Sequence, residues 1–310
     1  MVNVLVTGAA GNIGSALVDR LLSSRKYFVV AVDNFLTGLP RKLPASNSDC
    51  YVFIKADVNN YADIGAIMLA YRFEYVFHYA AVVGVQRTLD NPVLVLNDIQ
   101  GIKHVLDLSK NTGVKRVFYS SSSEVYGEPV EFPQNEATTP LNSRLPYAVV
   151  KNVGESFLRS YHREYGLNYT IFRFFNTYGP RQSEDFVITR FLKQALKGEP
   201  ISVYGEGIQS RTFCYIDDNI DTTMLCLQND YCINDVMNIG SDDEITIRQL
   251  AERIIKITNS ASQIRYLPAL AEGDMTRRKP DISRMKKILG RPLVTLEEGI
   301  RLTMQNKMFT

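Results

Sequence analysis

The pair of side chains best suited to chemistry is Tyr147 and Lys151, which stand four residues apart in the segment Tyr-Ala-Val-Val-Lys. On a helix, residues at this spacing share a face, so the phenol and the ammonium group can point into one site. A free tyrosine titrates at about pH 10, and a fixed positive charge nearby lowers its pKa by favouring the phenolate. Such a base can take the proton of an alcohol or sugar hydroxyl while a hydride leaves the same carbon. The serine run Ser120–Ser123 lies upstream and is interpreted together with this pair.

A glycine-rich segment near the start of the chain indicates that the hydride acceptor is a dinucleotide. Gly8, Gly11 and Gly14 follow the apolar run Val4–Val6 and precede an amphipathic run at helical spacing. In dinucleotide-binding proteins the first glycine permits a tight turn, the second lets the backbone approach the pyrophosphate, and the third lets the helix pack closely on the strand. The N–H groups at the start of the helix then bind the phosphates.

An acidic residue at the end of the next apolar run selects between the two common dinucleotides. The predicted second strand, Phe28–Val32, is followed by Asp33, about 20 residues after the glycines, where a carboxylate accepts hydrogen bonds from both ribose hydroxyls. The same carboxylate would repel the extra phosphate of NADP. The sequence therefore predicts NAD as the cofactor.

Composition and charge are typical of a globular enzyme that has no polyanionic partner. The chain has 310 residues, of which 45% are hydrophobic and 22% are charged, and this is enough to bury a full core. A net charge of +2 without a basic block argues against nucleic acid or an anionic membrane as the main partner. The four cysteines show no C-x-x-C spacing, so we expect neither a disulfide framework nor a metal site. Because a strand is predicted from Val2 and no apolar run reaches about 18 residues, we expect a cytoplasmic protein.

The elements that must position these side chains alternate between strands and helices over the first 180 residues. Helices are predicted at 15–23, 62–71, 93–111 and 147–165, and strands at 2–6, 28–32, 50–54, 75–79, 116–120 and 170–174. This alternation predicts an α/β fold with a doubly wound parallel Rossmann sheet. Ligands of such sheets bind beyond the carboxyl ends of the strands. At that edge we expect to find the segments that follow five of the strands: the glycine motif, Asp33, Ala80–Ala81, the serine run and Phe175–Asn176.

The pattern changes after residue 180. Helical runs at 187–197, 219–227, 247–257, 285–289 and 296–304 are mixed with short strands at 201–204 and 211–216. We predict that residues 1–180 form the NAD-binding Rossmann domain and that residues 181–310 mainly form a smaller α/β lobe for the substrate. Some of the chain is expected to cross back between the two parts.

With these features, the chain resembles the extended short-chain dehydrogenase/reductase superfamily, in the branch that modifies nucleotide sugars. The resemblance runs over nearly the whole chain and rests on motifs that occur in the family's order. These are G-A-A-G-N-I-G at Gly8–Gly14, D-N-F at Asp33–Phe35, A-D-V at Ala56–Val58, H-Y-A-A at His78–Ala81, S-S-S-E-V-Y-G at Ser121–Gly127, Y-A-V-V-K at Tyr147–Lys151, R-F-F-N-T-Y-G-P-R at Arg173–Arg181, R-T-F-C-Y-I-D-D at Arg211–Asp218 and R-R-K-P-D-I at Arg277–Ile282.

The resemblance implies a role for each matching residue of the cofactor site. Ser122 matches the family's serine or threonine that shares a hydrogen bond with the reacting sugar hydroxyl. Tyr147 matches the base, and Lys151 matches its electrostatic helper, which also holds the nicotinamide ribose. Asp57 and Val58 match the pair that contacts the adenine. The full set implied for cofactor binding is Gly8, Gly11, Asn12, Ile13, Gly14, Asp33, Asn34, Phe35, Gly38, Asp57, Val58, Ala80, Ala81, Ser120, Tyr147 and Lys151.

The substrate implied by the resemblance is a nucleotide-diphosphate sugar. Asn176 matches a residue that binds the diphosphate, and Arg211 matches a cationic contact to the same group, for which the planar charged fork of arginine is well suited. Tyr204 either packs in the core or lies against the nucleobase. Arg87 either binds a carboxylate or phosphate or pairs with Asp90. Homodimers are common in the resembling family, and we expect one here.

The resembling enzymes share oxidation of the sugar at C4 and differ in the step that follows. A 4-epimerase returns the hydride to the other face, a 4,6-dehydratase removes the C5 hydrogen and the C6 hydroxyl, and a uronate decarboxylase loses the C6 carboxylate as carbon dioxide. Ser122, Ser123 and Glu124 are close to the Thr-Ser-Glu of UDP-glucuronate decarboxylases, whereas dehydratases carry an Asp-Glu pair at the last two positions. Arg278 matches the catalytic arginine of the decarboxylases and suits a substrate carboxylate.

Two other segments favour an epimerase. Val82–Thr88 stands where decarboxylases have a proline-rich loop with a tyrosine, and Pro140–Pro146 is also similar to epimerases. We therefore rank UDP-glucuronate decarboxylase first, nucleotide-sugar 4-epimerase second and 4,6-dehydratase third. A pseudo-enzyme that only binds NAD would be expected to have lost Ser122, Tyr147 or Lys151, and all three are present. A simple alcohol dehydrogenase would release NADH stoichiometrically, whereas a nucleotide-sugar enzyme of this kind retains its cofactor.

Overall fold

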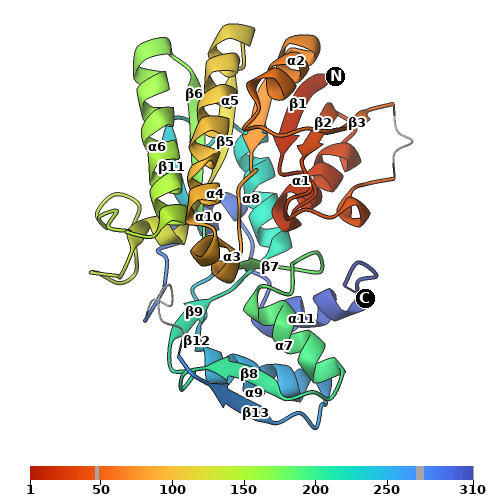
Figure 1. The fold of residues 1–310 in the computed structure, drawn as a ribbon, viewed down its shortest axis with the longest axis vertical. Coiled ribbons are helices and arrows are strands. Elements are labelled where there is room, and N and C mark those ends of the chain that lie inside the picture. The colour runs from red at the N-terminus through yellow and green to blue at the C-terminus, as the bar shows by residue number, and fades with distance from the viewer. Residues whose placement is uncertain (46–48, 270–275, 310) are drawn as a thin grey trace.

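A seven-stranded parallel sheet forms the centre of the computed structural model, which describes residues 1–45, 49–269 and 276–309 (Figure 1). The strand order is β11-β6-β5-β4-β1-β2-β3, and every pairing in it is parallel. Because the order reverses between β1 and β4, the carboxyl ends of these strands border a crevice. The predicted α/β fold with a doubly wound parallel sheet is confirmed. The strands are β1 (Val2–Thr7), β2 (Tyr27–Asp33), β3 (Tyr51–Lys55), β4 (Tyr75–His78), β5 (Arg116–Ser122), β6 (Asn168–Phe174) and β11 (Asp235–Ile239).

Helices cover both faces of this sheet because successive side chains of a strand point to opposite faces. Along β1, Val4 and Val6 belong to a core cluster with Leu17 of α1, whereas Leu5 belongs to a second cluster with Val105 of α5. The first face carries α1 (Asn12–Ser23), α8 (Ile216–Gln228) and α10 (Ser283–Leu289), and the second carries α2 (Tyr61–Tyr71), α5 (Asp98–Thr112) and α6 (Pro146–Tyr165).

A smaller lobe lies beyond the carboxyl ends of the strands (Figure 1). Its helices are α7 (Val187–Leu196), α9 (Ile247–Thr258) and α11 (Leu296–Gln305). In the part of the chain that is described, short strands pair here in twos: β7 (Thr177–Tyr178) with β10 (Cys214–Tyr215), β8 (Ile201–Tyr204) with β13 (Ile264–Leu267), and β9 (Ser210–Thr212) with β12 (Glu244–Thr246).

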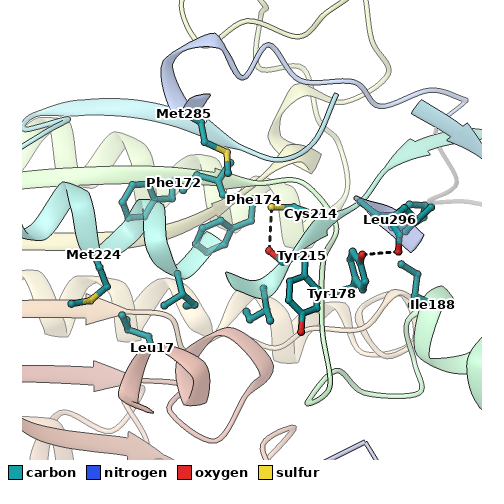
Figure 2. Close-up of a cluster of buried hydrophobic side chains, with 14 of the residues drawn as sticks. Leu17, Phe172, Phe174, Tyr178, Ile188, Cys214, Tyr215, Met224, Met285 and Leu296 are labelled. Carbon is teal, nitrogen blue, oxygen red and sulfur yellow. Dashed lines mark hydrogen bonds between the residues drawn. The ribbon is translucent and has the colours of Figure 1, made fainter. Parts of the chain in front are cut away.

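The lobe and one face of the sheet share a single hydrophobic cluster. Figure 2 shows it running from Leu17 and Met224, past Phe172 of the sheet, to Ile188 and Leu296 of the lobe. The hydroxyl of Tyr178 donates to the carbonyl oxygen of Leu296 at 3.3 Å inside the cluster. Because this cluster continues from the sheet into the lobe, the lobe is packed firmly against the sheet. The residues that the sheet and the lobe contribute to a site between them therefore have fixed relative positions.

The structure differs from the sequence-based elements in several places. The strand predicted at 211–216 is divided at Phe213 into β9 and β10, and Ile216 already begins α8. The helix predicted at 93–111 is divided into α4 (Pro92–Leu96) and α5, and α3 (Val85–Asp90) precedes them. The strand β11 was not predicted, because Asn238 interrupts its short apolar run. β11 follows residue 180 but belongs to the main sheet, and α8 and α10, which also follow it, pack on that sheet. The chain therefore returns from the lobe to the sheet after residue 180. The domain boundary at residue 180 stays a prediction.

Within the described ranges, no helix combines the length and apolar character needed to cross a bilayer. The four cysteines are all free thiols. The cytoplasmic location and the homodimer expected from the sequence stay predictions.

Candidate functional site

A cleft of about 340 Å³ opens at the carboxyl ends of the sheet strands. Its walls come from the segments after β1, β2, β3, β4 and β5, from α6, and from residues of the lobe such as Phe213. Phe35, Gly38, Tyr204 and Arg211 lie outside its wall. The other residues of the predicted site all line it: Gly8, Gly11, Asn12, Ile13, Gly14, Asp33, Asn34, Asp57, Val58, Ala80, Ala81, Arg87, Ser120, Ser122, Ser123, Glu124, Tyr147, Lys151, Asn176 and Arg278.

The glycine segment forms a close turn between β1 and α1. Gly8 has a φ of +69°, and a Cβ on it would lie 2.7 Å from the backbone nitrogen of Ala80. A Cβ on Gly14 would lie 2.2 Å from the carbonyl oxygen of Gly8, so only glycine lets the helix approach the strand this closely. Gly11 is the N-cap residue of α1, and no side chain caps the first turn. The backbone N–H groups at this helix start, which line the cleft, suit the pyrophosphate of a dinucleotide.

Asp33 ends β2 at the cleft, with a carboxylate held by the backbone. Its Oδ2 accepts from the N–H of Ala10 at 2.9 Å, and its Oδ1 accepts from the N–H of Phe35 at 2.8 Å. Phe35 has a left-handed φ of +63°, and its ring packs against Phe53. A Cβ on Gly38 would lie 2.7 Å from Oδ1 of Asp33. Phe35 and Gly38 therefore shape the surroundings of this carboxylate instead of lining the cleft.

The segments after β3 and β4 complete the side of the cleft around Asp33. Asp57 accepts from the backbone N–H of Asn59 at 2.9 Å and from Nδ2 of Asn34 at 3.1 Å. His78, at the end of β4, is buried with its Nδ1 3.0 Å from the hydroxyl of Thr7. Burial lowers the pKa of His78 to about 3, so the ring is neutral and serves as a core residue.

Replacing Asp33 with alanine is expected to weaken NAD binding by about 10- to 100-fold, because a charged hydrogen-bond acceptor contributes roughly 1.5–3 kcal/mol. Binding of NADP should weaken less or improve, since the carboxylate no longer repels the extra phosphate. Calorimetric titration with NAD and with NADP measures the two dissociation constants and so the preference between the dinucleotides. Asp242→Ala, which removes a surface carboxylate paired with Lys286, is the matched control. An unchanged preference for NAD in Asp33→Ala would contradict the assignment.

The opposite side of the cleft carries the serine run and the tyrosine–lysine pair. Tyr147 and Lys151 lie one turn apart at the start of α6, whose first residue is Pro146. The Nζ of Lys151 lies 3.4 Å from Oγ of Ser120 and 5.6 Å from the centroid of the Tyr147 ring. Ser122, the last residue of β5, is hydrogen-bonded to Tyr147. The structure thus brings the predicted base, its cationic partner and the serine hydroxyls together.

Burial has the largest effect on the ionisation of Tyr147. Burial and the negative charge of Glu124 raise the pKa of the phenol, whereas the hydrogen bond with Ser122 and the positive charge of Arg278 lower it. These effects raise the pKa of the phenol overall, so a positive charge beside it is needed to favour the phenolate; the lowering by Lys151 that the sequence predicts stays a prediction. Burial also lowers the pKa of Lys151 to about 8, and the charge of Asp98 acts in the opposite direction.

Glu124 and Arg278 meet on the cleft wall although 154 residues separate them in sequence. The Nη1 of Arg278 lies 3.5 Å from Oε1 of Glu124, and their side chains are 8% and 20% exposed. Glu124 belongs to the short 3₁₀ helix η2 (Ser123–Tyr126), which begins where the hydroxyl of Ser122 accepts from the Glu124 N–H at 3.2 Å. In the sequence, Glu124 and Arg278 belong to two separate motifs. In the structure, they form an ion pair.

Two residues predicted to bind the substrate also lie on the cleft wall. Asn176 has a left-handed φ of +41°, and its Nδ2 donates to the carbonyl oxygen of Thr212 at 2.9 Å. Arg87 pairs with Asp185 at 3.1 Å, and this partner replaces Asp90, which the sequence suggested. Since Arg87 and Asp185 both line the cleft, their ion pair connects two of its borders.

The other two predicted substrate residues, Tyr204 and Arg211, belong to the body of the lobe. The ring centroid of Tyr204 lies 5.4 Å from the guanidinium carbon of Arg190. Arg211 is 7% exposed, and its Nη1 donates to the carbonyl oxygen of Ser210 at 2.7 Å. They lie outside the cleft wall because β8 packs on α7 and α9 while β9 pairs with β12. Their contacts with a substrate stay predictions.

Several cleft residues were missed by the sequence reasoning because they belong to no motif. Lys42, in the short 3₁₀ helix η1 (Pro40–Lys42), is buried, which lowers its pKa, while the charge of Asp33 raises it. Burial raises the pKa of Asp98, whose Oδ2 accepts from the N–H of Val82 at 2.7 Å. In the sequence, Asp98 signals only a helix start. The apolar members of this group include Leu36, Leu94, Phe186 and Ile188.

The pKa of Lys151 predicts the alkaline limit of activity. Its folded pKa is lowered from 10.5 to about 8 by burial, so the ammonium charge is intact below pH 8 and is lost as the pH rises through that value. If this charge assists the reaction, kcat/KM should fall by up to about tenfold per pH unit above the folded pKa. A pH profile of kcat/KM measures this alkaline decrease. In Lys151→Arg the side chain stays charged, so the activity that remains should not show the decrease. A wild-type profile that is flat up to the ordinary lysine pKa would contradict the role.

Comparisons with known proteins agree with this geometry. The model of the NAD dependent epimerase/dehydratase family matches residues 4–240. UDP-glucuronic acid decarboxylase 3 of Arabidopsis thaliana is 35% identical over 310 residues, which cover 96% of this chain and 87% of that protein. The structure of UDP-glucose 4-epimerase from Thermotoga maritima is 34% identical, with a TM-score of 0.91 and coverage of 98% of this chain and 97% of that one. That of UDP-glucuronic acid 4-epimerase from Bacillus cereus is 30% identical, with a TM-score of 0.88 and coverage of 98% and 99%.

These matches confirm the family and the NAD cofactor that the sequence predicted. They extend over nearly the whole chain, and they agree with the glycine turn, the acidic end of β2 and the tyrosine–lysine pair described above. The chain therefore belongs to the NAD-dependent epimerase/dehydratase family, within the extended short-chain dehydrogenases/reductases, and is an NAD-dependent enzyme.

Proposed function

We propose that the chain decarboxylates UDP-glucuronate through transient oxidation of the sugar at C4. The observation that carries the proposal is the pairing of Arg278 with Glu124 at 3.5 Å on the wall of the cleft that also holds Ser122 and Tyr147. A guanidinium group recognises a carboxylate well because it combines a permanent charge with a planar fork of donors. A carboxyl group beside it can hold and move a proton at the neighbouring carbon. The similarity to UDP-glucuronic acid decarboxylases supports this substrate.

The residues of the cleft suit the successive steps of this reaction. Tyr147, as the phenolate that neighbouring positive charges favour, would take the proton of the C4 hydroxyl, and Ser122 would share a hydrogen bond with the same oxygen. NAD held in its oxidised form by the glycine turn and Asp33 would accept the C4 hydride and return it to the ketone at the end of the reaction, and its positive charge would favour the phenolate. Arg278 would orient the C6 carboxylate, which is β to the new C4 ketone. The C5–C6 bond then breaks, its electron pair moves toward the ketone, carbon dioxide leaves, and Glu124 would direct a proton to C5.

A 4-epimerase of a nucleotide sugar is the second candidate. The segment Val82–Thr88, which is similar to the corresponding segment of epimerases, contributes residues to the cleft wall. One of them is Arg87, which forms an ion pair with Asp185 of another segment. The similarity to 4-epimerase structures, including one for UDP-glucuronic acid, favours this alternative. In that reaction Arg278 would hold a carboxylate that is retained. A 4,6-dehydratase ranks third because Ser123 replaces the aspartate expected there.

The products of a substrate panel test the proposal. The purified enzyme with its NAD is incubated with UDP-glucuronate labelled with ¹³C at C6, with UDP-glucose and with UDP-N-acetylglucosamine, and the products are identified by NMR. Labelled carbon dioxide and a UDP-pentose from UDP-glucuronate are the expected result. Retention of the label in a C4 epimer would overturn decarboxylation in favour of epimerisation. Turnover confined to the neutral sugars would overturn the carboxylate as the recognised group.

A further inference from the structure

A buried hydrogen-bond network connects α6 to the segment that carries Arg278. Its members are Glu155, Arg173, Tyr126 and Asn238, whose exposures are 0%, 2%, 1% and 0%. None of the four is part of the cleft wall, and none has a role in the chemistry described above. Charged and polar groups are buried at this density only when they are fully paired, so the arrangement of their partners is informative.

The first half of this buried network fixes the end of β5 against α6. The Nε and Nη2 atoms of Arg173 donate to the two carboxylate oxygens of Glu155 at 2.9 and 2.8 Å. Glu155 also accepts from the hydroxyl of Ser121 at 2.6 Å. Ser121 immediately precedes Ser122, and Glu155 lies on the same helix as Tyr147. The ion pair therefore sets the position of the serine strand relative to the tyrosine.

The hydroxyl of Tyr126 joins the two halves of the network. It accepts from Nη1 of Arg173 at 2.8 Å and donates to Oδ1 of Asn238 at 2.7 Å. Burial raises the pKa of Tyr126 to about 12, so the hydroxyl keeps the proton that it donates. Tyr126 ends η2, two residues after Glu124. This hydroxyl therefore connects the short helix that carries Glu124 to the strand β11.

Asn238 continues the network to the segment of Arg278. Its Nδ2 donates to the carbonyl oxygens of Gln134 and Asp281 at 2.9 and 3.3 Å. The backbone N–H of Gln134 donates to the carbonyl oxygen of Lys279 at 2.7 Å, and its carbonyl oxygen accepts from the N–H of Asp281 at 2.8 Å. Lys279 is the neighbour of Arg278. The network thus begins beside the serine strand and ends one residue from the guanidinium that faces the cleft.

We infer that Tyr126 and Asn238 are positioning residues that hold Glu124 and Arg278 at the separation needed for the step at C5 and C6. The inference rests on the proposed function, because it assigns the pair to the loss of carbon dioxide. Oxidation at C4 depends on Tyr147, Lys151 and Ser122, which are held by α6 and β5. A change at Tyr126 should therefore slow the second step more than the first.

The test follows the two steps separately in Tyr126→Phe, which removes one hydroxyl and keeps the ring. The enzyme with its NAD is mixed with UDP-glucuronate, and absorbance at 340 nm reports C4 oxidation while trapped carbon dioxide reports the second step. Carbon dioxide release is expected to fall roughly 10- to 100-fold, as for other small misplacements of reacting groups. The oxidation phase should stay near its wild-type rate, so reduced cofactor accumulates on the enzyme.

A matched variant and a second position complete the experiment. Tyr161→Phe removes the hydroxyl of another tyrosine that is mostly buried, bonded to Asp107 at 2.8 Å and away from the cleft, and should keep the wild-type ratio of the two phases. Asn238→Asp retains the acceptor for Tyr126 but loses both amide donors, and should shift the ratio as Tyr126→Phe does.

Four results would overturn the inference. A wild-type ratio of the two phases in Tyr126→Phe and Asn238→Asp would do so, as would equal slowing of both phases. Failure of both variants to fold, seen as loss of the melting transition, would assign the network to stability alone. Release of no carbon dioxide by the wild-type enzyme would instead overturn the proposed function, and the inference with it.

Discussion

Tyr147→Phe is expected to reduce turnover of the nucleotide sugar by about 100- to 10,000-fold, the range typical for loss of a general acid or base. In the proposed reaction the phenol oxygen takes the proton of the C4 hydroxyl, and phenylalanine has no atom to replace it. The substituted ring keeps the packing of the cleft wall, so NAD should remain bound. Turnover is measured by NMR of the product, and bound NAD by its release on denaturation.

Tyr231→Phe, a change at an exposed tyrosine outside the cleft, is the control and should leave turnover unchanged. Wild-type turnover in Tyr147→Phe would show that another group moves the proton. Loss of bound NAD together with turnover would show that the tyrosine acts mainly in cofactor binding.

Arg278→Gln should lower kcat/KM for UDP-glucuronate by at least about 30-fold, because truncating one member of a largely buried charge pair costs roughly 2–5 kcal/mol. Two effects act together. The substrate carboxylate loses its cationic partner, and Glu124, which lies 3.5 Å from the guanidinium, is left unpaired beside it. A neutral sugar such as UDP-glucose should show a smaller effect, since only the second of these costs applies. Steady-state kinetics with both substrates measure the difference.

Arg248→Gln is the matched control, because Arg248 forms a surface ion pair with Glu252 in which the side chains are 60% and 51% exposed. Exposed pairs of this kind contribute about 0–1 kcal/mol, so kinetics and melting temperature should change little. Arg278→Lys should fall between the wild type and Arg278→Gln, since the charge remains and the planar fork is lost. An equal loss for charged and neutral sugars in Arg278→Gln would contradict carboxylate recognition.

The parts of the site that were predictable from the sequence are those built within single local units. The glycines of the first turn, the acid at the end of β2, and the tyrosine and lysine one turn apart on α6 are each recognised from residue types at short spacing within one strand or helix and the turn beside it. Strand and helix periodicity was sufficient to order these units along a parallel sheet, and the sheet topology then requires their ends to converge. NAD and a tyrosine–lysine pair could therefore be predicted before any contact was known.

The parts that could not be predicted depend on contacts between distant segments. β11 pairs with β6 through residues that carry a weak strand pattern, and its Asn238 is buried in a network with partners from three other segments. Asp98 and Lys42 line the cleft without belonging to a motif. Phe35 and Gly38 lie against the carboxylate of Asp33, because the backbone turns back on it, and their predicted contacts with the cofactor stay predictions.

The sequence by itself determined the family, the NAD cofactor and the positions of Tyr147 and Lys151, because each is encoded by residue types at short, fixed spacing. Only the tertiary structure decided that Glu124 and Arg278 form a pair, that Arg87 contacts Asp185, and that burial raises the pKa of Tyr147. The physical reason is that a charge contact and a desolvation cost depend on distance and burial in space. Glu124 and Arg278 are 154 positions apart, so neither the distance between them nor their burial can be derived from the residue pattern around either one.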